Sequence, residues 1–509
     1  MTKFDVAIVG GGINGAVSAA ALSAAGLSVL LLEKNDFASQ TSQESSNMVW
    51  GGIKYLQTFE IPLVYKLCRS RSRLFEAFPT RIRQIGFFAV GDKNAPAAPL
   101  ITYAGALLYW FIGLFGTKAP RYFGTKMAKQ YEGLVDETRV RGAVQYFDGL
   151  LNDNDARFVW DFINRAKQLG ADTRNYTEMV AATRETDGWL VELQDQLTKQ
   201  RSTVSATVLI NAAGPESAEL NQKISVSTKN SLALSKGIHL IVPKITADDR
   251  VIAVWDEDGR LFYVLPMHDR SVIGTTDTRV AAVTKEVTEA DREFVLRNIN
   301  QALKLATPLT KADIIAERSG VRPLVISSPK KGAKSQEIDW HKLSRKHEIE
   351  VDAQTKAITI FGGKLTDCLN IGEEVLQAVS KLGLRGNKPA RWFGEDKMAG
   401  TAERLRQLLS DIVKDSSYLN LLVDGLWRRH GEQAFEIADL FLKNPDAAEP
   451  VFPGLGFSFG ELDFIIQNEQ VKTAEDLLRR RTPIALVRSD DEIANNSRLQ
   501  KLVHQRISA

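Results

Sequence analysis

Cysteine is scarce in this sequence, which has 509 residues and only two cysteines, Cys68 and Cys368. A disulfide framework is therefore not the expected source of stability, and such cysteine usage is typical of a reducing compartment. The sequence contains neither a CxxC motif nor the paired Cys and His spacing of a zinc site. We therefore expect no metal centre.

The sequence also lacks an excess of charge of either sign. It has 65 basic and 62 acidic residues, for a formal net charge of +3. A nucleic-acid-binding protein would have basic residues in marked excess, so we expect no nucleic-acid partner. Hydrophobic residues make up 44% and charged residues 25%, which is typical of a soluble globular protein. The length predicts two or three domains.

Long apolar runs are rare, with one exception at residues 94–117, which carry no formal charge. About 20 apolar residues suffice to span a bilayer, but Pro96, Pro99 and several glycines interrupt this stretch. Three interpretations stay open: a buried cap helix, a helix lying in a membrane interface, and a transmembrane helix. Tyr109, Trp110 and the basic residues after Lys118 favour the interfacial helix. A strand pattern starts within the first few residues, so we expect no signal peptide.

A nucleotide-binding motif begins the chain. The apolar run from Phe4 to Val9 predicts a buried parallel strand, and G-x-G-x-x-G follows at Gly10, Gly12 and Gly15. An alanine-rich helix and a second strand come next, and this strand ends at Glu33. The first glycine permits a tight turn, the second lets backbone approach a pyrophosphate, and the third lets helix and strand pack closely. The helix N-terminus attracts phosphate, and Glu33 is placed to bind ribose hydroxyls.

This motif alone does not distinguish NAD from FAD, but the continuation favours a flavin. The hydroxyl-rich segment Ser39–Ser46 follows the ribose acid and is able to return across a pyrophosphate, with a simple linker as the alternative. A second glycine turn, Gly362-Gly363-Lys364-Leu365-Thr366, leads into a predicted helix from Asp367 to Lys381. A flavin ring that takes up electrons needs positive potential beside it, and a helix N-terminus supplies this potential.

The remaining pattern divides the chain into domains. The small-residue turn after residues 205–214 also suits a close approach to a cofactor. Residues 225–346 instead contain short strands separated by turns, which predicts an antiparallel sheet. After residue 391 apolar residues recur at helical spacing. We therefore predict an α/β fold with a Rossmann-like FAD-binding domain (1–79, 152–224 and 347–390), interrupted by an antiparallel-sheet substrate or cap domain (80–151 and 225–346) and followed by a C-terminal helical domain (391–509).

Several motifs together resemble one family. They are DVAIVGGGINGA, SSNMVWGGIKYL, VLINAAGP, SKGIHLIVP, SVIGTTDT, SGVRPL and FGGKLTDC, and they cover residues 1 to about 390. In this order they resemble the FAD-dependent, respiratory glycerol-3-phosphate dehydrogenases, and the C-terminal stretches LVDGLWRRHG and TAEDLLRRRTPIAL are similar to that family's extra domain. The resemblance implies oxidation of sn-glycerol-3-phosphate to dihydroxyacetone phosphate by hydride transfer from C2 to flavin N5, with electrons passed to a quinone.

The family's site residues map onto this sequence by motif. The resemblance and the motifs above predict FAD binding by Gly10, Gly12, Asn14, Gly15, Glu33, Lys34, Thr41, Ser42, Ser45, Ser46, Val180, Ala213, Gly214, Gly363, Leu365 and Thr366. The predicted substrate-binding residues are Lys54, Tyr55, Arg322, Arg345, Lys364 and Thr366. Arg322 offers a forked contact to phosphate and Lys364 a point charge. The predicted catalytic residues are His239, Lys364 and Arg322, and His239 and Lys364 are alternative proton acceptors.

The sequence also departs from the family pattern. Lys54 replaces an arginine, Asn47 and Trp50 stand where the family commonly has Lys and His, and Asp367-Cys368-Leu369 replaces Thr-Tyr-Arg. A lysine loses the forked recognition of phosphate that arginine provides. Two alternatives to glycerol-3-phosphate oxidation therefore stay open. One is an FAD dehydrogenase or oxidase for another small hydroxy or amino acid, and the other is a catalytically silent FAD-binding protein.

The partners are predicted from the family resemblance and, for the membrane contact, also from the apolar stretch at 94–117. They are a small anionic substrate such as glycerol-3-phosphate, a quinone, and a membrane surface contacted from the cytoplasmic side. A homodimer is a further possibility. The basic run Arg479-Arg480-Arg481 is the densest in the sequence. Its interpretations are a solvated helix face, an interface with a second subunit, or contact with anionic lipid.

Overall fold

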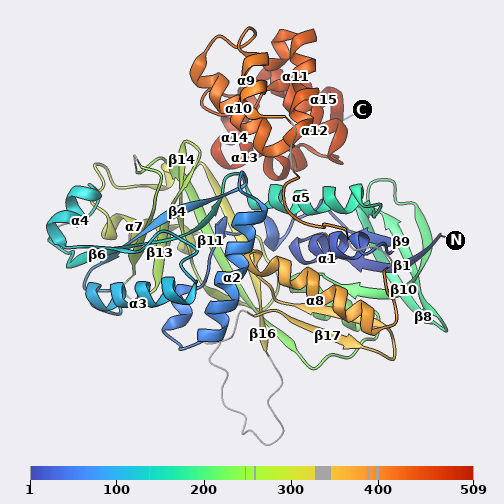
Figure 1. Ribbon diagram of the computed structural model, residues 1–509. Helices are drawn as coiled ribbons and strands as arrows, with labels where there is room; N and C mark the ends of the chain where they lie inside the picture. The colour runs from blue at the N-terminus through green and yellow to red at the C-terminus, as the bar shows by residue number, and fades with distance from the viewer. Residues whose placement is uncertain are drawn as a thin grey trace, which may run out of the picture.

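The computed structural model describes residues 2–507, except 137, 247, 257–258, 327–345, 387–389 and 397–399. Two β-sheets with covering helices form the main body, and a separate helical domain lies on one side of it, next to helix α5 (Figure 1). The predicted fold class, an α/β chain with a helical C-terminal domain, is confirmed.

The first sheet has a parallel centre, as the apolar strand at the start of the chain predicts. Its order is β17-β18-β10-β1-β2-β7, and β9 pairs with β10 and β8. The pairs of β1 with β10 and β2 are parallel, as are β10 with β18 and β2 with β7. The strands are β1 Thr2–Val9, β2 Val29–Leu32, β7 Asp172–Arg174, β8 Thr177–Glu185, β9 Gly188–Asp195, β10 Arg201–Asn211, β17 Glu348–Asp352 and β18 Ala357–Phe361.

Helices α1 (Ile13–Ala24), α5 (Asp155–Gln168) and α8 (Cys368–Lys381) pack against this sheet in one hydrophobic core. Small side chains let α1 lie close to its neighbours, since its alanines are buried between α5, α8 and strands β1 and β2. Parallel strands need both faces covered, which explains why their sequences read as continuous apolar runs. This is the doubly wound arrangement that places a ligand at the carboxyl ends of the strands.

The second sheet is largely antiparallel and follows the order β15-β11-β14-β13-β12-β4-β6-β3, with β16 on β11 and β5 on β6. Strands β12 and β4 run parallel. The strands are β3 Met48–Val49, β4 Ile82–Gly91, β5 Arg121–Phe123, β6 Gly142–Leu151, β11 Ser231–Pro243, β12 Val251–Trp255, β13 Leu261–Met267, β14 Arg270–Gly274, β15 Thr278–Val280 and β16 Ala316–Ile326. The helices in and around this region are α2 Ile61–Ala77, α3 Pro99–Ile112, α4 Thr125–Tyr131 and α7 Glu289–Ala302, whereas α6 Ser217–Lys223 contacts β10 and β18 of the first sheet. Strand β3 belongs to this sheet, although its residues fall within the range predicted for the FAD-binding domain. The domain boundaries given above remain our proposal.

The C-terminal domain has a helical core of its own around Leu405, Leu422 and Phe441. Its helices are α9 Ala402–Leu409, α10 Ser416–His430, α11 Ala434–Lys443, α12 Phe459–Asn468, α13 Ile484–Val487, α14 Asp490–Asn495 and α15 Ser497–Ile507. A π-helical turn, Asp476–Arg481, precedes α13. Arg479, Arg480 and Arg481 lie in this turn and are all buried. The interpretations of this run as a solvated face, a subunit interface or a lipid contact are therefore wrong, because acidic groups inside the same chain surround it.

The apolar stretch at 94–117 forms α3, whose side chains are largely uncovered. Within the helix only Ala106 and Tyr109 are buried, whereas Leu100 and Phe111 are each 64% exposed. The buried cap helix is therefore the wrong interpretation of this stretch. None of the described helices is long and apolar enough to cross a membrane. The interfacial helix remains a prediction.

Candidate active site

The turn between β1 and α1 has the geometry that its glycines predict. Gly10 has φ +110°, and a Cβ there would lie 2.5 Å from the carbonyl oxygen of Ala212 on the neighbouring strand. A Cβ on Gly15 would overlap the carbonyl oxygen of Gly10, so only glycine lets α1 start this close to β1. The N-cap residue Gly12 brings no side chain, and since the amide of Ile13 donates to Ser42, the next amides of the first turn of α1 are left open to a ligand.

A cavity opens at this turn. It encloses about 1120 Å³, including the part that is open to solvent. Its lining residues come from segments as far apart as Val9 and Gly363, so the space suits a large, extended ligand such as a dinucleotide. Its wall includes predicted cofactor residues from three distant parts of the chain: Gly10, Gly12, Asn14, Glu33, Lys34, Thr41, Ser42, Ala213, Gly214 and Gly363.

Glu33 is held at the carboxyl end of β2 by backbone amides. Its Oε2 accepts a hydrogen bond from the amide of Gly11 at 2.8 Å, and its Oε1 accepts one from the amide of Asn35 at 2.9 Å. Burial raises the pKa of Glu33, and the two amide hydrogen bonds oppose this rise. Glu33 also lines the cavity, as a ribose-binding acid requires.

Asn14 joins the two glycine turns. Its amide nitrogen donates to the carbonyl oxygen of Gly362 at 2.9 Å, across 348 residues of sequence. Its Oδ1 is buried and has no hydrogen-bond partner among the described residues, although Asn14 lines the cavity. Buried amide oxygens are normally satisfied, so this atom marks a position where a ligand group donates. The open amides, the close-packed glycines and this oxygen together fit FAD.

The segment from residue 33 to 46, which we call the cofactor loop, forms one wall of the cavity. The Oγ of Ser42 accepts a hydrogen bond from the amide of Ile13 at 3.0 Å. The hydroxyl of Thr41 donates to the carbonyl oxygen of Val321 on β16 at 2.7 Å. The loop therefore bridges the nucleotide-binding turn and the substrate-side sheet, as expected for a segment that returns across a pyrophosphate.

Six predicted cofactor residues are not among those that line the cavity. Gly15 acts through close packing, and the backbone amide of Ser45 donates to Asp155 at 2.7 Å. Thr366 accepts a hydrogen bond from the amide of Trp50 at 2.9 Å, which ties the glycine turn at 362–366 to the 47–56 segment. Ser46, Val180 and Leu365 have no contact that assigns them a role, so their cofactor contacts remain predictions.

The predicted substrate residues form two groups, and each contains a residue that directly adjoins a lining residue in sequence. In the first, the ammonium of Lys364 donates to the hydroxyl of Tyr55 at 2.6 Å and lies 4.1 Å from the centre of its ring. Lys364 directly follows Gly363, which lines the cavity. The sequence separation of these two residues is 309 positions, so the fold itself creates this pair of a cation and a phenol.

In the second group, Arg322 precedes Pro323, which also lines the cavity. Its guanidinium donates to the hydroxyl of Thr275 at 3.1 Å and lies 3.6 Å from a carboxyl oxygen of Asp277. His239, on β11, is buried, and its Nδ1 has no hydrogen-bond partner among the described residues. Burial first, and then the charges of Arg318 and Arg322, hold the pKa of His239 well below its usual value. Its imidazole is therefore neutral at pH 7.

The two remaining predicted substrate residues are Lys54 and Arg345. Lys54 is exposed on the short helical turn Ile53–Leu56. Arg345 lies outside the described residues, so its contact remains a prediction. Of the residues that depart from the family pattern, Asn47 adopts φ +58° and accepts a hydrogen bond from the amide of Asp155. The ring of Trp50 lies 6.0 Å from that of Tyr55, so it borders the substrate group.

Sequence reasoning missed a buried charge chain behind the second glycine turn. The Nδ1 of His347 lies 2.6 Å from a carboxyl oxygen of Asp367, and its Nε2 lies 2.9 Å from one of Glu374. Burial alone would lower the pKa of His347, but these two acids outweigh burial and raise it. The hydrogen bond from His347 holds the pKa of Glu374 at about 2. The departure at Asp367 thus supplies a partner for His347 at the start of α8.

Comparisons with known protein families identify the same cofactor as the geometry of the cavity. The family model described as FAD dependent oxidoreductase matches residues 5–336, and the model described as C-terminal domain of alpha-glycerophosphate oxidase matches residues 353–508. The chain is 28% identical to the aerobic glycerol-3-phosphate dehydrogenase of Escherichia coli, over 100% of this chain and 99% of that protein. It is 28% identical to a glycerol-3-phosphate dehydrogenase of Synechocystis, over 96% and 90%.

Solved structures share the fold. The glycerol-3-phosphate dehydrogenase from Bacillus halodurans, complexed with FAD, superposes with a TM-score of 0.76 at 23% identity, over 99% of this chain and 91% of that one. The FAD-bound L-alpha-glycerophosphate oxidase from Mycoplasma pneumoniae gives 0.58 at 17% identity, over 79% and 100%.

The fold and the cavity define a flavin-dependent redox enzyme with a Rossmann-type cofactor domain. Since the family model covers well over half of the sequence, the chain belongs to the FAD-dependent oxidoreductase family, and its cofactor is FAD.

Proposed function

We propose that this enzyme oxidises sn-glycerol-3-phosphate to dihydroxyacetone phosphate and passes the electrons to a quinone. The observation that supports this most directly is the pair of cations beside the cofactor cavity: Arg322 adjoins the lining residue Pro323, and Lys364 adjoins the lining residue Gly363. A small phosphorylated alcohol needs such positive charge to bind its phosphate. The relatives described above are named glycerol-3-phosphate dehydrogenases, and the similarity covers nearly their whole length.

Each residue has a role in this proposal. Bound FAD supplies the hydride acceptor. Arg322 and Lys364 bind the phosphate, and the hydroxyl of Tyr55 orients Lys364. His239 accepts the proton of the C2 hydroxyl at its unpaired Nδ1. Arg318 and Arg322 lower the pKa of His239, so a phosphate dianion that pairs with Arg322 raises this pKa again. Substrate binding therefore makes His239 a better base.

An anaerobic titration tests this function. Glycerol-3-phosphate should bleach the flavin absorbance of the wild type, and a soluble quinone should restore it. The variant Arg322→Met should need about 10- to 150-fold more substrate, because it loses a charge-assisted hydrogen bond worth about 1.5–3 kcal/mol. Arg297→Met removes an exposed arginine of α7 and serves as the matched control.

Two outcomes would contradict the proposal. If glycerol-3-phosphate leaves the flavin oxidised while another hydroxy or amino acid bleaches it, the substrate assignment is wrong. If the protein binds flavin tightly but no small alcohol or acid reduces it, the chain is a silent FAD-binding protein.

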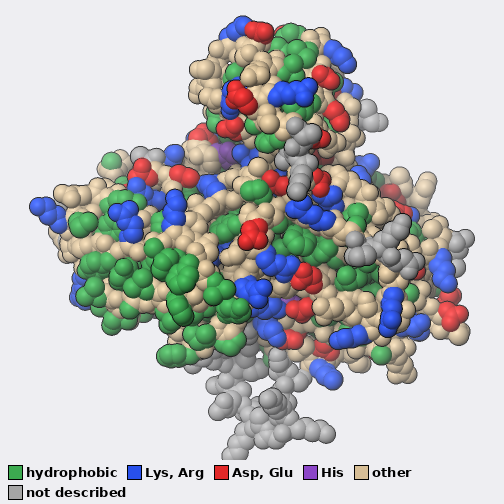
Figure 2. Space-filling view, in the orientation of Figure 1, with side chains coloured by type: hydrophobic (Ala, Val, Ile, Leu, Met, Phe, Trp, Pro, Cys, Tyr) green, Lys and Arg blue, Asp and Glu red, His purple; other side chains and the backbone are tan. Residues whose placement is uncertain are grey.

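We also propose that the enzyme attaches to the cytoplasmic side of the membrane through α3. Hydrophobic side chains gather on the face of the molecule where α3 lies (Figures 1 and 2). Large exposed apolar residues of this surface, which we call the α3 surface, are Leu100, Ile101, Leu107, Leu108, Phe111, Leu114 and Phe115. The exposed cations Lys118, Arg121 and Lys126 follow in sequence and suit anionic lipid headgroups. A quinone dissolved in the bilayer is then within reach of the enzyme, and wild-type protein should fractionate with membranes.

A further inference from the structure

The cofactor loop has two faces with different neighbours. Its inner face supplies Glu33, Thr41 and Ser42 to the FAD cavity. Its outer face supplies the buried side chains of Asp36 and Gln43 and the carboxylate of Glu44, which contact the C-terminal domain. Three arginines of that domain, Arg479–Arg481, meet this outer face, and we call them the arginine triplet.

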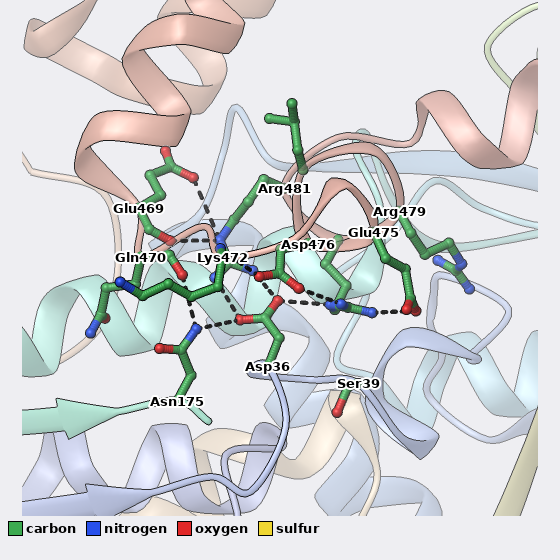
Figure 3. A network of polar contacts seen from close by, with 12 residues as sticks. Asp36, Ser39, Asn175, Glu469, Gln470, Lys472, Glu475, Asp476, Arg479 and Arg481 are labelled. Carbon is green, nitrogen blue, oxygen red and sulfur yellow. Dashed lines mark hydrogen bonds and ion pairs between the residues drawn. The ribbon is translucent and has the colours of Figure 1, made fainter. Parts of the chain in front are cut away.

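Asp36 is the centre of the contact (Figure 3). Both of its carboxyl oxygens accept hydrogen bonds from Arg481, at 2.8 and 2.9 Å, and Oδ2 also accepts one from Arg480 at 2.7 Å. The amide of Asn175 donates to Oδ1 at 3.0 Å. Burial alone would raise the pKa of Asp36, but the charges of Arg481 and Arg480 outweigh it and lower the pKa. The carboxylate is thus ionised, fully buried and neutralised by the C-terminal domain.

Arg479 holds the other end of the outer face. Its Nη2 donates to the carbonyl oxygen of Gln43 at 2.8 Å and to the carboxylate of Glu44 at 3.1 Å. The same carbonyl oxygen accepts a hydrogen bond from Arg318 of β16 at 2.7 Å. Gln43 directly follows Ser42, whose Oγ accepts the amide of Ile13 at the start of α1. The arginine contact therefore lies one residue from a side chain that bonds to the phosphate-binding turn.

Because the interacting groups are charged and buried, the position of the cofactor loop depends strongly on the position of the arginine triplet. A buried carboxylate that loses its guanidinium partners is costly, because burial has already removed the water that would solvate it. If the arginine triplet moves away, Asp36 loses both guanidinium partners and must reach solvent, so the cofactor loop must move with it. Thr41 and Ser42 would then leave the positions in which they line the cavity.

We propose that the arginine triplet is a set of positioning residues for FAD. Its contact with the outer face holds the cofactor loop in the shape that binds the cofactor, so this contact and FAD binding are thermodynamically coupled. Coupling of this kind is reciprocal: bound FAD must favour docking of the π-helical turn by the same factor. Known couplings between sites change an affinity by about 5- to 150-fold.

The test measures FAD affinity of full-length apoprotein by quenching of flavin fluorescence. Asp36→Asn keeps the shape of the side chain and removes its charge, and Arg479→Gln removes the contact at the other end of the loop. Both variants should raise the Kd for FAD by about 5- to 150-fold. Arg488→Gln is the matched control, because Arg488 is also a buried arginine of the C-terminal domain but bonds to Asp269 and to the carbonyl oxygen of Pro453, away from the cofactor loop. Its Kd should equal that of the wild type, even where its Tm falls.

Hydrogen exchange gives a second readout that is independent of any variant. Adding FAD to wild-type apoprotein should slow exchange of the amides at Leu477–Thr482 at least about fivefold and leave those of α9 unchanged. This measurement still decides the matter if Asp36→Asn does not fold. The proposal is overturned if FAD leaves exchange in the π-helical turn unchanged, or if Asp36→Asn and Arg479→Gln lower the Tm as Arg488→Gln does and bind FAD with wild-type affinity.

Discussion

The α3 surface leads to a quantitative prediction about membrane attachment. Leu100, Phe111 and Leu114 are 64%, 64% and 63% exposed. Full burial of a Leu or Phe side chain contributes about 1.5–3 kcal/mol, so burying the exposed fraction of each contributes about 1–2 kcal/mol. The triple variant with glutamine at these three positions should therefore bind lipid about 3–6 kcal/mol more weakly. That energy corresponds to about a 10²- to 10⁴-fold lower partition coefficient.

The assay is cosedimentation with vesicles that contain anionic lipid, with the bound fraction measured against lipid concentration. Surface substitutions usually change stability by less than about 0.5 kcal/mol, so the three glutamines should leave the Tm and the flavin spectrum nearly unchanged. The control replaces Leu421, Leu440 and Leu442, which are exposed on the C-terminal domain, with glutamine. This control variant should bind vesicles as the wild type does.

Two results would refute the reasoning. Wild-type protein that stays in the supernatant at every lipid concentration would show that the α3 surface has another partner. A triple variant that binds as tightly as the wild type would show that attachment depends on a different part of the molecule. Raising the salt concentration should weaken binding without abolishing it, since the cations near Lys118 add about 1 kcal/mol each and salt screens only this electrostatic part.

Two further predictions concern the interior of the site. Asn14→Leu removes the donor to Gly362 and the unpaired Oδ1, so the Kd for FAD should rise about 10- to 100-fold in a fluorescence titration; an unchanged Kd would mean that this oxygen faces no cofactor group. His347 has a pKa above its ordinary 6.5, so its ion pairs with Asp367 and Glu374 stabilise the fold fully below pH 6.5 and lose this contribution as the pH rises through the raised pKa. His347→Gln should therefore cost about 2 kcal/mol at pH 6 and less at pH 9, as measured by Tm against pH, and a loss that grows with pH would show the opposite linkage.

Local patterns in the sequence predicted the cofactor half of the site well. The glycines at 10, 12 and 15, together with Glu33, act within a single strand–turn–helix–strand unit, so their spacing alone determines their geometry. The second glycine turn at 362–366 was also recognisable as a strand followed by a helix. What the spacing did not reveal is the hydrogen bond from Asn14 to Gly362, because the contact depends on how two distant turns pack together.

Residues that act through tertiary contacts were harder to predict. The sequence offered no reason to single out His347, which directly precedes β17. Its role depends on contacts with Asp367 and Glu374, which only the folded chain brings close. The arginine triplet was misread because a run of three cations is normally solvated. Its counter-charges, Asp36 and Glu44, lie more than 430 positions earlier in the chain, and only the docked domain brings them together.

The departures from the family pattern divide into two groups once their surroundings are known. Asp367 bonds to His347 at the start of α8, and Cys368 and Leu369 are buried in the core beneath the first sheet. These three changes belong to the packing of α8 and leave the cavity wall at Gly362 and Gly363 intact. Trp50 is different, because its ring lies beside Tyr55, the partner of Lys364. Any shift of substrate preference away from the family's pattern should therefore originate at Trp50, where the indole replaces an ionisable imidazole next to the proposed phosphate-binding residue Lys364.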